Sequence, residues 1–313
     1  MNESEGTPAQ GLTMAPPISV GVPVYNGEKY LRVALDGLLK QTFTDFEIII
    51  CDNASTDLTQ AICLEYAARD PRIRYVRNAK NIGANSNFHY VFTLGRGKYF
   101  QWNSVDDYFA ATYLEKCKEV LDSDPRAVLC CAKVSVIDES GAIIEESRDA
   151  QELLQASAAQ RFKQKFAQDA RNNTLYGLIR SDVLRKTKVV ENYTGSDNVL
   201  MEHLALYGRF REVPEYLFFR RTHPDAFTYA PTIERIREFY APEAISGGER
   251  FGVIASRHVI EYFRVIFSTP LPLLEKLELL GFLLRFVWWK KGVMLREMTM
   301  LGASFFKKQR RSA

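Results

Sequence analysis

Cysteine is scarce in this sequence, and its spacing supports no disulfide or metal chemistry. The 313 residues include five cysteines, an odd number, with no CxxC pair and no cluster with histidine. This spacing predicts neither a disulfide framework nor a zinc site. We expect small, buried apolar side chains in a reducing compartment at Cys51, Cys63, Cys117, Cys130 and Cys131.

Long apolar runs are missing as well. A membrane-spanning helix needs about 18 or more apolar residues with few charges, and the nearest run, residues 277–289, is interrupted by Glu278 and Arg285. The first fifteen residues lack the basic and apolar regions of a secretory signal. We therefore expect a disordered tail at residues 1–15 and a cytoplasmic protein.

An excess of one charge is also absent. The 41 basic and 38 acidic residues leave a net charge of +3, which is too small to predict a nucleic-acid partner, although basic residues concentrate in the last segment, "FFKKQRRSA". The hydrophobic fraction of 46% is sufficient for a large core. We expect one large globular domain, alone or with an appendage.

Strand and helix patterns alternate over the first half of the chain. Residues 18–25, "ISVGVPVY", form a continuous apolar run, and leucines at helical spacing follow from Leu31 to Leu39. The alternation continues up to a predicted strand at residues 127–137. Such alternation is typical of an α/β fold with a mostly parallel sheet flanked by helices.

The pattern is less regular after residue 150. It predicts a helix at 150–172, a short strand and helix at 176–186, a helix ending at Gly208 and an extended segment at 210–223. From residue 226 onward the sequence is mainly helical. We therefore predict one domain at 16–225 and a helical C-terminal region at 226–313.

Polar residues follow the predicted strands, at "NGE" (26–28), "DNASTD" (52–57), "NIG" (81–83) and "SVDD" (104–107). Open α/β sheets bind ligands beyond the carboxyl ends of their strands. Asp52 is positioned to accept hydrogen bonds from a nucleotide, and Asp57 to cap the next helix. A plain turn explains the same residues equally well.

Asp106 and Asp107 are the stronger signal. Two adjacent carboxylates repel each other unless water or a cation intervenes, and Mg²⁺ takes oxygen ligands while bridging phosphates. The alternative is an N-cap of the following helix. With a strand directly before them, we favour binding of a metal or phosphate over capping.

Asp197 and His223 are weaker candidates. Asp197 opens an amphipathic helix, so it is either a general base or an N-cap, and chemistry alone favours the cap. His223 is either a metal or diphosphate ligand or a structural histidine. Arg220 and Arg221 beside it suit phosphate oxygens or an ordinary solvated face.

Five segments in this order resemble family 2 glycosyltransferases, which are inverting enzymes with the GT-A fold. They are "ISVGVPVYNGEKYL", "IIICDNASTDLT", "NAKNIGANSN", "KYFQWNSVDDYF" and "GSDNVLMEHLALYG". The resemblance covers residues 17 to about 225. It implies a Rossmann-like, mostly parallel sheet flanked by helices, with a C-terminal helical appendage outside the family pattern.

The resemblance also implies roles for individual residues. It places seven residues along the nucleotide sugar: Pro23, Tyr25, Glu28, Asp52, Asn81, Gly83 and Asp106. Asp52 is expected to form a hydrogen bond with the base. Asp106 matches the last Asp of the Asp-x-Asp metal motif, and the implied ligands of Mg²⁺ or Mn²⁺ are Asp106, Asp107 and His223. Asp197 matches the general base. Two positions depart from the family pattern, because Ser104 and Ser196 stand where acidic residues are usual.

The implied activity is transfer of a sugar, as a hexosyl or deoxyhexosyl group, from a UDP-, TDP- or GDP-sugar to a hydroxyl of a glycan or lipid-linked acceptor. Surface polysaccharide biosynthesis is the expected setting. A nucleotidyltransferase is disfavoured, because "PVYNGEKY" lacks a glycine-rich phosphate loop. A degenerate protein that lost its metal through Ser104 and serves as a membrane-bound assembly partner stays open.

The C-terminal region interleaves aromatic and basic residues. Residues 272–308 combine leucine, phenylalanine and paired tryptophan with lysine and arginine. This composition is typical of helices that lie in a membrane interface, and a core-packing or dimer-forming helix explains it equally well. Membrane contact would place the protein peripherally on the inner face of the plasma membrane.

Overall fold

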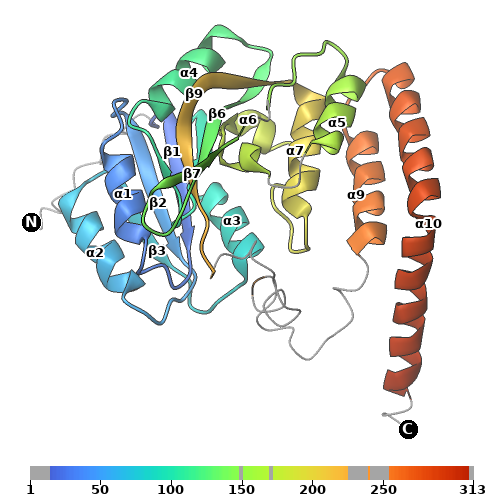
Figure 1. The fold of residues 1–313 in the computed structure, drawn as a ribbon, viewed down its shortest axis with the longest axis horizontal. Helices are drawn as coiled ribbons and strands as arrows, with labels where there is room; N and C mark the ends of the chain where they lie inside the picture. Colours follow the sequence, from blue (N-terminus) through green and yellow to red (C-terminus); the bar gives the residue numbers. More distant parts are fainter. Residues whose placement is uncertain (1–14, 148–150, 169–171, 225–238, 240–253, 310–313) are drawn as a thin grey trace, which may run out of the picture.

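The computed structural model describes residues 15–147, 151–168, 172–224, 239 and 254–309 (Figure 1). It is an α/β structure built on a nine-stranded sheet in the order β3-β2-β1-β4-β8-β6-β9-β5, with β7 paired to β6. The predicted tail at residues 1–15 lies outside the described residues except for Ala15, as does most of the segment 226–253 of the predicted C-terminal region.

The first half of the sheet is parallel, as the sequence predicted. Strands β1 (Ile18–Val24), β2 (Phe46–Asp52), β3 (Ile73–Arg77) and β4 (Tyr99–Trp102) pair in the order β3-β2-β1-β4. Helices α1 (Leu31–Leu39), α2 (Thr59–Arg69) and α3 (Ala84–Thr93) connect them. Every residue of β1 and β2 is buried, which accounts for their continuous apolar sequences.

The second half of the sheet is mixed. After α4 (Tyr113–Ser123), the predicted strand β6 (Ala127–Ile137) does not join β4, because β8 (Leu178–Arg180) lies antiparallel between them. Strand β9 (Arg209–Arg221), the predicted extended segment, pairs parallel with β6. Two short strands were not predicted, β5 (Tyr108–Phe109) on β9 and β7 (Ile143–Glu146) on β6.

Helices dominate the remaining part of the molecule. They are the 3₁₀ helix η1 (Asn173–Tyr176), α5 (Ala158–Ala167), α6 (Ser181–Leu184), α7 (Ser196–Tyr207), α9 (Ile254–Ser268) and α10 (Leu273–Gln309). Helix α5 is shorter than predicted: Ser157 caps it, with Oγ accepting the N–H of Gln160, and Leu153 forms a β-bridge to Phe210.

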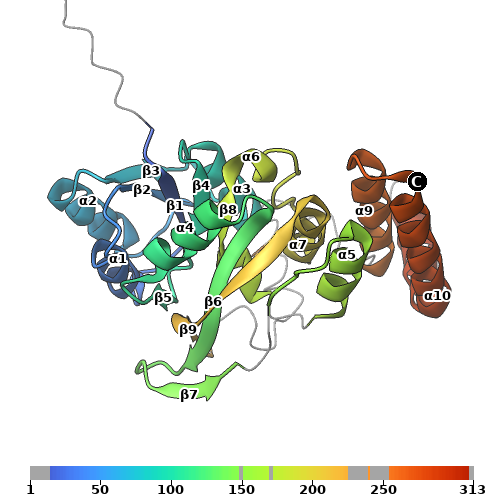
Figure 2. The same ribbon diagram turned by 90° about the horizontal axis from the view of Figure 1, so that it is seen from above.

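The C-terminal helices share a core with the rest of the chain (Figure 2). Phe162 of α5, Val199 of α7, Ile266 of α9 and Leu283 of α10 belong to one buried cluster. Helices α9 and α10 therefore pack against the sheet-bearing part of the molecule through α5 and α7. Among the described residues, no helix has the length and apolarity required to cross a membrane.

The cysteines match the prediction of buried, unpaired residues. All five are buried, and each has a free thiol. Burial raises the pKa of the Cys51 and Cys63 thiols to about 12. Because the thiolate is the reactive form, these side chains act as small apolar residues at neutral pH.

Glu202 on α7 makes the stability of the fold depend on pH. Burial raises the pKa of Glu202 from 4.5 to about 8; the charge of Asp197 adds to this shift, and Tyr262 and Lys165 oppose it. Between these two pH values the unfolded chain has lost the proton that the folded chain retains. The free energy of unfolding should therefore fall as pH rises from about 4.5 to about 8.

We predict that Glu202→Gln removes this dependence, because the amide stays neutral. Relative to the wild type, the free energy of unfolding of the variant should rise by about 4–5 kcal/mol from acidic pH to pH 8, because the pKa rises from 4.5 to about 8 and each pKa unit corresponds to about 1.4 kcal/mol. Denaturant titrations at several pH values measure this difference. The matched control is Glu119→Gln on the exposed face of α4. Parallel pH curves for wild type and Glu202→Gln would refute the prediction.

Candidate active site

A cavity of about 680 Å³ opens where the strands of the sheet end. The turns after β1, β2 and β4 contribute to its walls, together with the end of β9. Of the ten residues to which the resemblance assigns a binding or catalytic role, seven line it: Pro23, Tyr25, Glu28, Asn81, Asp106, Asp107 and His223. Asp52, Gly83 and Asp197 are not among the described residues that line this cavity.

Asp106 and His223 meet inside this cavity. Nε2 of the buried His223 lies 3.6 Å from Oδ2 of Asp106, whose side chain is 36% exposed. The backbone N–H of Asp106 donates to Oγ of Ser104 at 3.4 Å. Ser104, one of the departures from the family pattern, therefore supports the turn that presents Asp106.

Asp107 is buried and faces β9. Its Oδ1 accepts the backbone N–H of Arg221 at 2.8 Å. Burial raises the pKa of Asp107 to about 7; the charge of Asp106 adds to the shift, and the hydrogen bond from Arg221 opposes it. This geometry gives Asp107 a positioning role, and its role as a metal ligand stays a prediction.

The side chain of Arg221 joins three parts of the site. Its Nε donates to the carbonyl of Asp106 at 3.0 Å, and Nη1 donates to the carbonyls of Asp138 and Glu139 at 2.9 and 3.0 Å. The guanidinium carbon lies 4.7 Å from the centre of the Tyr30 ring, and that ring lies 5.2 Å from His223. The end of β9, the Asp106 turn and the β6–β7 turn are thus held together.

The side chains that line the cavity are suited to a divalent cation whose remaining coordination positions are filled by a bound ligand. The described residues contain no group of three or more His, Cys, Asp or Glu close enough to hold a metal. Asp106 and His223 would supply two ligands, and Mg²⁺ is usually held by one or two carboxylates together with substrate phosphates and water. Arg220 and Arg221 line the same cavity, where phosphate oxygens would need positive charge.

Asp52 lies beneath the cavity and not in its wall. Its carboxylate is fully buried and accepts the backbone N–H of Ser55 and the hydroxyl of Tyr75, both at 2.8 Å, as well as a hydrogen bond from Arg77. The next residue, Asn53, lines the cavity instead. The predicted contact of Asp52 with a base stays a prediction, because it requires one of these partners to give way.

Asn53 belongs to an amide network that the sequence analysis missed. Its Nδ2 donates to Oδ1 of Asn81 at 2.7 Å, and its Oδ1 accepts the N–H of Ile82 at 2.9 Å. Oδ1 of Asn81 also accepts the N–H of Gly83, which opens α3 with a φ of 85°. The position of Asn53 directly after a buried strand was the signal that could have identified it.

Glu28 and Asp57 tie the β1 turn to the start of α2. The Glu28 carboxylate accepts the N–H of Leu58 at 2.9 Å, while Asp57 accepts the N–H groups of Glu28 and Thr59 at 3.1 and 3.0 Å. Asp57 thus satisfies the N–H of the first helical residue, as expected of a capping side chain, although Leu58 occupies the N-cap position of α2. Tyr25, in the same turn, is 41% exposed and presents its ring at the cavity.

Asp197 lies in the first turn of α7, behind the cavity wall. Its Oδ2 accepts a hydrogen bond from Nδ2 of Asn172 at 2.9 Å. The neighbouring Asn173 accepts one from Nη1 of Arg220, which lines the cavity. No sequence pattern indicated Asn172, Asn173 or the cavity-lining Tyr176, because η1 is a single short turn of 3₁₀ helix without a recognisable motif.

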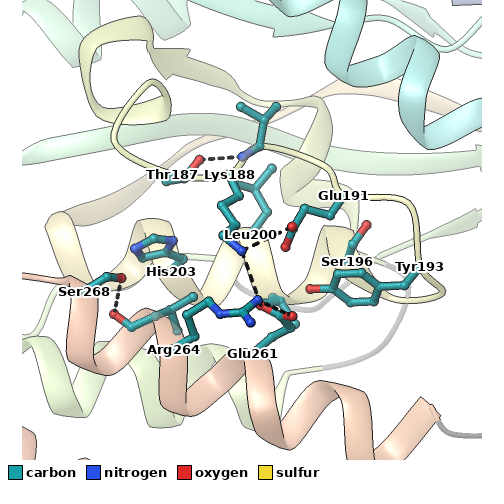
Figure 3. A pocket seen from close by; sticks show the side chains of 13 residues that line it. Thr187, Lys188, Glu191, Tyr193, Ser196, Leu200, His203, Glu261, Arg264 and Ser268 are labelled. Carbon is teal, nitrogen blue, oxygen red and sulfur yellow. Dashed lines mark hydrogen bonds and ion pairs between the residues drawn. The ribbon is translucent and has the colours of Figure 1, made fainter.

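A second, smaller cavity, of about 30 Å³, lies between α9 and the loop before α7 (Figure 3). Glu261 of α9, 1% exposed, pairs with Arg264 at 2.7 Å and with Lys188 of the loop at 4.0 Å. Lys188 also pairs with Glu191 at 3.3 Å. These charges fasten the loop that leads to Asp197 onto α9.

Comparison with known proteins identifies relatives for the first part of the chain. The model of "Glycosyl transferase family 2" matches residues 19–194. An uncharacterised protein of Mycobacterium bovis is 43% identical over 122 residues, 38% of this chain and 35% of that protein. Chondroitin synthase of Escherichia coli is 33% identical over 133 residues, 42% of this chain and 19% of that protein. The matches span about a third of these relatives' length or less.

Solved structures resemble the chain over most of its length. S. aureus TarS 1-349 in complex with UDP-GlcNAc has a TM-score of 0.62 at 16% identity, covering 90% of this chain and 79% of that one. Mannosyltransferase PcManGT from Pyrobaculum calidifontis, in complex with GDP-Man and Mn²⁺, has a TM-score of 0.51 at 14% identity, covering 93% and 76%. These neighbours confirm the predicted GT-A fold, and with a family model that matches more than half of its residues the chain belongs to glycosyl transferase family 2.

Proposed function

We propose that the protein is an inverting glycosyltransferase. It moves a hexosyl or deoxyhexosyl group from a nucleoside diphosphate to a hydroxyl of a glycan or lipid-linked acceptor in surface polysaccharide biosynthesis. The observation that carries this proposal is the 680 Å³ cavity in which Asp106 and His223 share the wall with two arginines. Solved neighbours in complex with UDP-GlcNAc and GDP-Man, and a chondroitin synthase among the relatives, support it.

The donor would lie across the strand ends. Arg220 and Arg221 are placed to bind diphosphate oxygens through charge-assisted hydrogen bonds. The exposed ring of Tyr25 offers a stacking surface for the base, beside Pro23 and Glu28. Asn53 and Asn81 present amides to the same side of the cavity, and a UDP-, TDP- or GDP-sugar suits this set of polar groups.

Asp106 and His223 would hold Mg²⁺ or Mn²⁺, with Asp107 fixing the turn behind them. When bound, the ion supplies positive charge that stabilises the diphosphate as it leaves. Ser104 does not prevent this arrangement, because its hydroxyl receives the N–H of Asp106 and supports the turn without a carboxylate. The turn therefore presents Asp106 to the cavity without a carboxylate at position 104.

Asp197 would act as the general base. In an inverting transfer the acceptor oxygen bonds to the anomeric carbon from the face opposite the leaving group, while the bond from that carbon to the phosphate oxygen breaks. The hydroxyl proton passes to the Asp197 carboxylate. The hydrogen bond from Asn172 holds this carboxylate in one orientation, and the loop anchored by Glu261 supports its helix.

The reaction would take place in the cytoplasm, at the inner face of the plasma membrane if the acceptor is lipid-linked. This location follows from the proposed acceptor and from the aromatic and basic sequence of the C-terminal helices.

Binding of the donor nucleotide can be measured by thermal shift. We expect one of UDP, GDP, TDP and CDP to raise the unfolding midpoint in the presence of Mn²⁺, with about 2.7 kcal/mol of stabilisation at a hundredfold excess over Kd. Asp106→Asn should abolish the metal-dependent part of this shift. The control is Asp45→Asn, which removes an exposed carboxylate before β2.

No midpoint shift with any of the four nucleotides would contradict donor binding. A full shift that needs no metal, unchanged in Asp106→Asn, would contradict the metal assignment while leaving donor binding intact.

The base assignment can be tested on hydrolysis of the sugar nucleotide, in which water replaces the acceptor. Asp197→Asn keeps the shape of the side chain and removes the proton acceptor, so kcat should fall by about 10²–10⁴-fold with nucleotide affinity unchanged. The control is Asp182→Asn, on the exposed side of α6. Wild-type turnover in Asp197→Asn would remove the assignment, and an inactive wild type would favour the degenerate protein.

A further inference from the structure

Helix α10 forms the outer edge of the molecule. Figures 1 and 2 show it beyond α9, on the side opposite α1 and α2. Its inner side packs into the core through Leu279 and Leu283, both fully buried. Up to Leu295, the opposite side of the helix carries exposed residues, among them Leu284 and Trp288.

The outer surface carries a continuous apolar stripe. Its members follow one another at intervals of four and seven residues, the spacing that places side chains on one helix face. Each is more than half exposed, and the stripe is about 33 Å long at 1.5 Å per residue. We define the α10 stripe as Leu273, Leu277, Leu284, Trp288 and Leu295.

The acidic residues of α10, in contrast, are turned toward the protein. Glu275 accepts the N–H of Ala159 at the start of α5, at 2.8 Å. Glu278 pairs with Lys163 of α5 at 2.5 Å. Glu297 accepts the N–H of Ala255 at the start of α9, at 2.9 Å. From Leu273 to Glu297, all three carboxylates are therefore used in packing the helix against the body.

The basic residues of the same segment have no acidic partner among the described residues. Lys290 and Lys291 lie over the rings of Trp289 and Trp288, with Nζ 4.6 and 3.4 Å from the ring centres. Arg296 donates only within the helix, to the carbonyl of Gly292 at 3.1 Å. By helical spacing Lys291 lies on the face of the stripe, Arg296 shares a flank with Glu278, and Lys290 lies on the side of the buried Leu283. From Leu273 to Glu297, the face of the stripe thus combines apolar side chains with the positive charge of Lys291 and carries no carboxylate.

This separation of charge identifies the kind of partner. A second copy of the chain would bring another positively charged face against this one, and like charges across an interface oppose association. An anionic lipid surface suits both the apolar and the basic side chains of α10. Leucine and tryptophan enter the boundary between the acyl chains and the headgroups, while lysine and arginine bind lipid phosphates.

We propose that α10 docks the protein on anionic membrane surfaces, lying along the interface with its stripe immersed. The inference does not depend on the proposed reaction, since it concerns a face formed by α10 alone. It selects the membrane over the dimer contact as the partner of the C-terminal helices.

Vesicle flotation of the full chain tests the proposal. The wild type should float with vesicles of phosphatidylcholine and phosphatidylglycerol and remain unbound with phosphatidylcholine alone, because each basic residue near an anionic surface contributes roughly fivefold. Binding should weaken as salt is raised. Leu284→Ser with Trp288→Ser should lower the partition at least about tenfold. The matched control is Leu64→Ser, which alters an exposed leucine of α2.

Tryptophan emission gives a second measurement. Trp102 is fully buried, whereas Trp288 and Trp289 are exposed, so only the α10 pair can enter lipid. A blue shift on addition of anionic vesicles is expected in the wild type. The stripe variant should keep the wild-type melting temperature, because Leu279 and Leu283 are untouched.

Two outcomes would overturn the proposal. One is equal flotation of the wild type and the stripe variant, which would place lipid contact elsewhere. The other is a wild type that binds no vesicles and is dimeric in solution while the stripe variant is monomeric, which would make the stripe a contact between copies.

Discussion

The hydrogen bond between the buried Asp107 carboxylate and the backbone N–H of Arg221 is the contact on which the candidate site depends. It fastens the end of β9 to the turn after β4, two segments far apart in the sequence. The Arg221 side chain extends this connection to the β6–β7 turn and to Tyr30. Together with the pairing of β5 and β9 and the bond from Arg221 Nε to the Asp106 carbonyl, it holds His223 beside Asp106.

Burial makes this contact sensitive to protonation. A carboxylate taken out of water loses its hydration, which is why the pKa of Asp107 rises to about 7 despite the hydrogen bond from Arg221. The chain therefore uses two adjacent aspartates differently. Asp107 is enclosed and organises the backbone. Asp106 remains open to the cavity, where it can bind a ligand.

Local sequence was sufficient to predict the parallel half of the fold, because strands buried on both faces must be continuously apolar and the helices between them must be amphipathic. It predicted the short strand that forms β8, but not its position between β4 and β6, which depends on contacts distant in sequence. Strand β5, with two residues, is too short to show any periodicity.

The candidate site likewise has parts that local sequence predicts and parts that depend on contacts distant in sequence. Residues that directly follow a strand, such as Asp106 and Asn81, were predicted at the cavity and line it. The orientation of a side chain at a strand tip was harder to infer: Asp52 was predicted to contact the base, whereas the next residue, Asn53, lines the cavity. The surroundings of Asp197 depend on the loop containing Asn172, which shows no pattern in the sequence, and on α9, whose helical pattern does not indicate which elements it packs against.

Helix α7, which carries Asp197, belongs to the same buried cluster as α5, α9 and α10. A shortened chain that ends before α9 would expose Phe162, Val199 and Leu206 to water, and it would also release the loop that Glu261 anchors. Loss of activity in such a truncated protein would then indicate damage to the structure around Asp197. Only point substitutions on the outer side of α10 can separate membrane binding from catalysis.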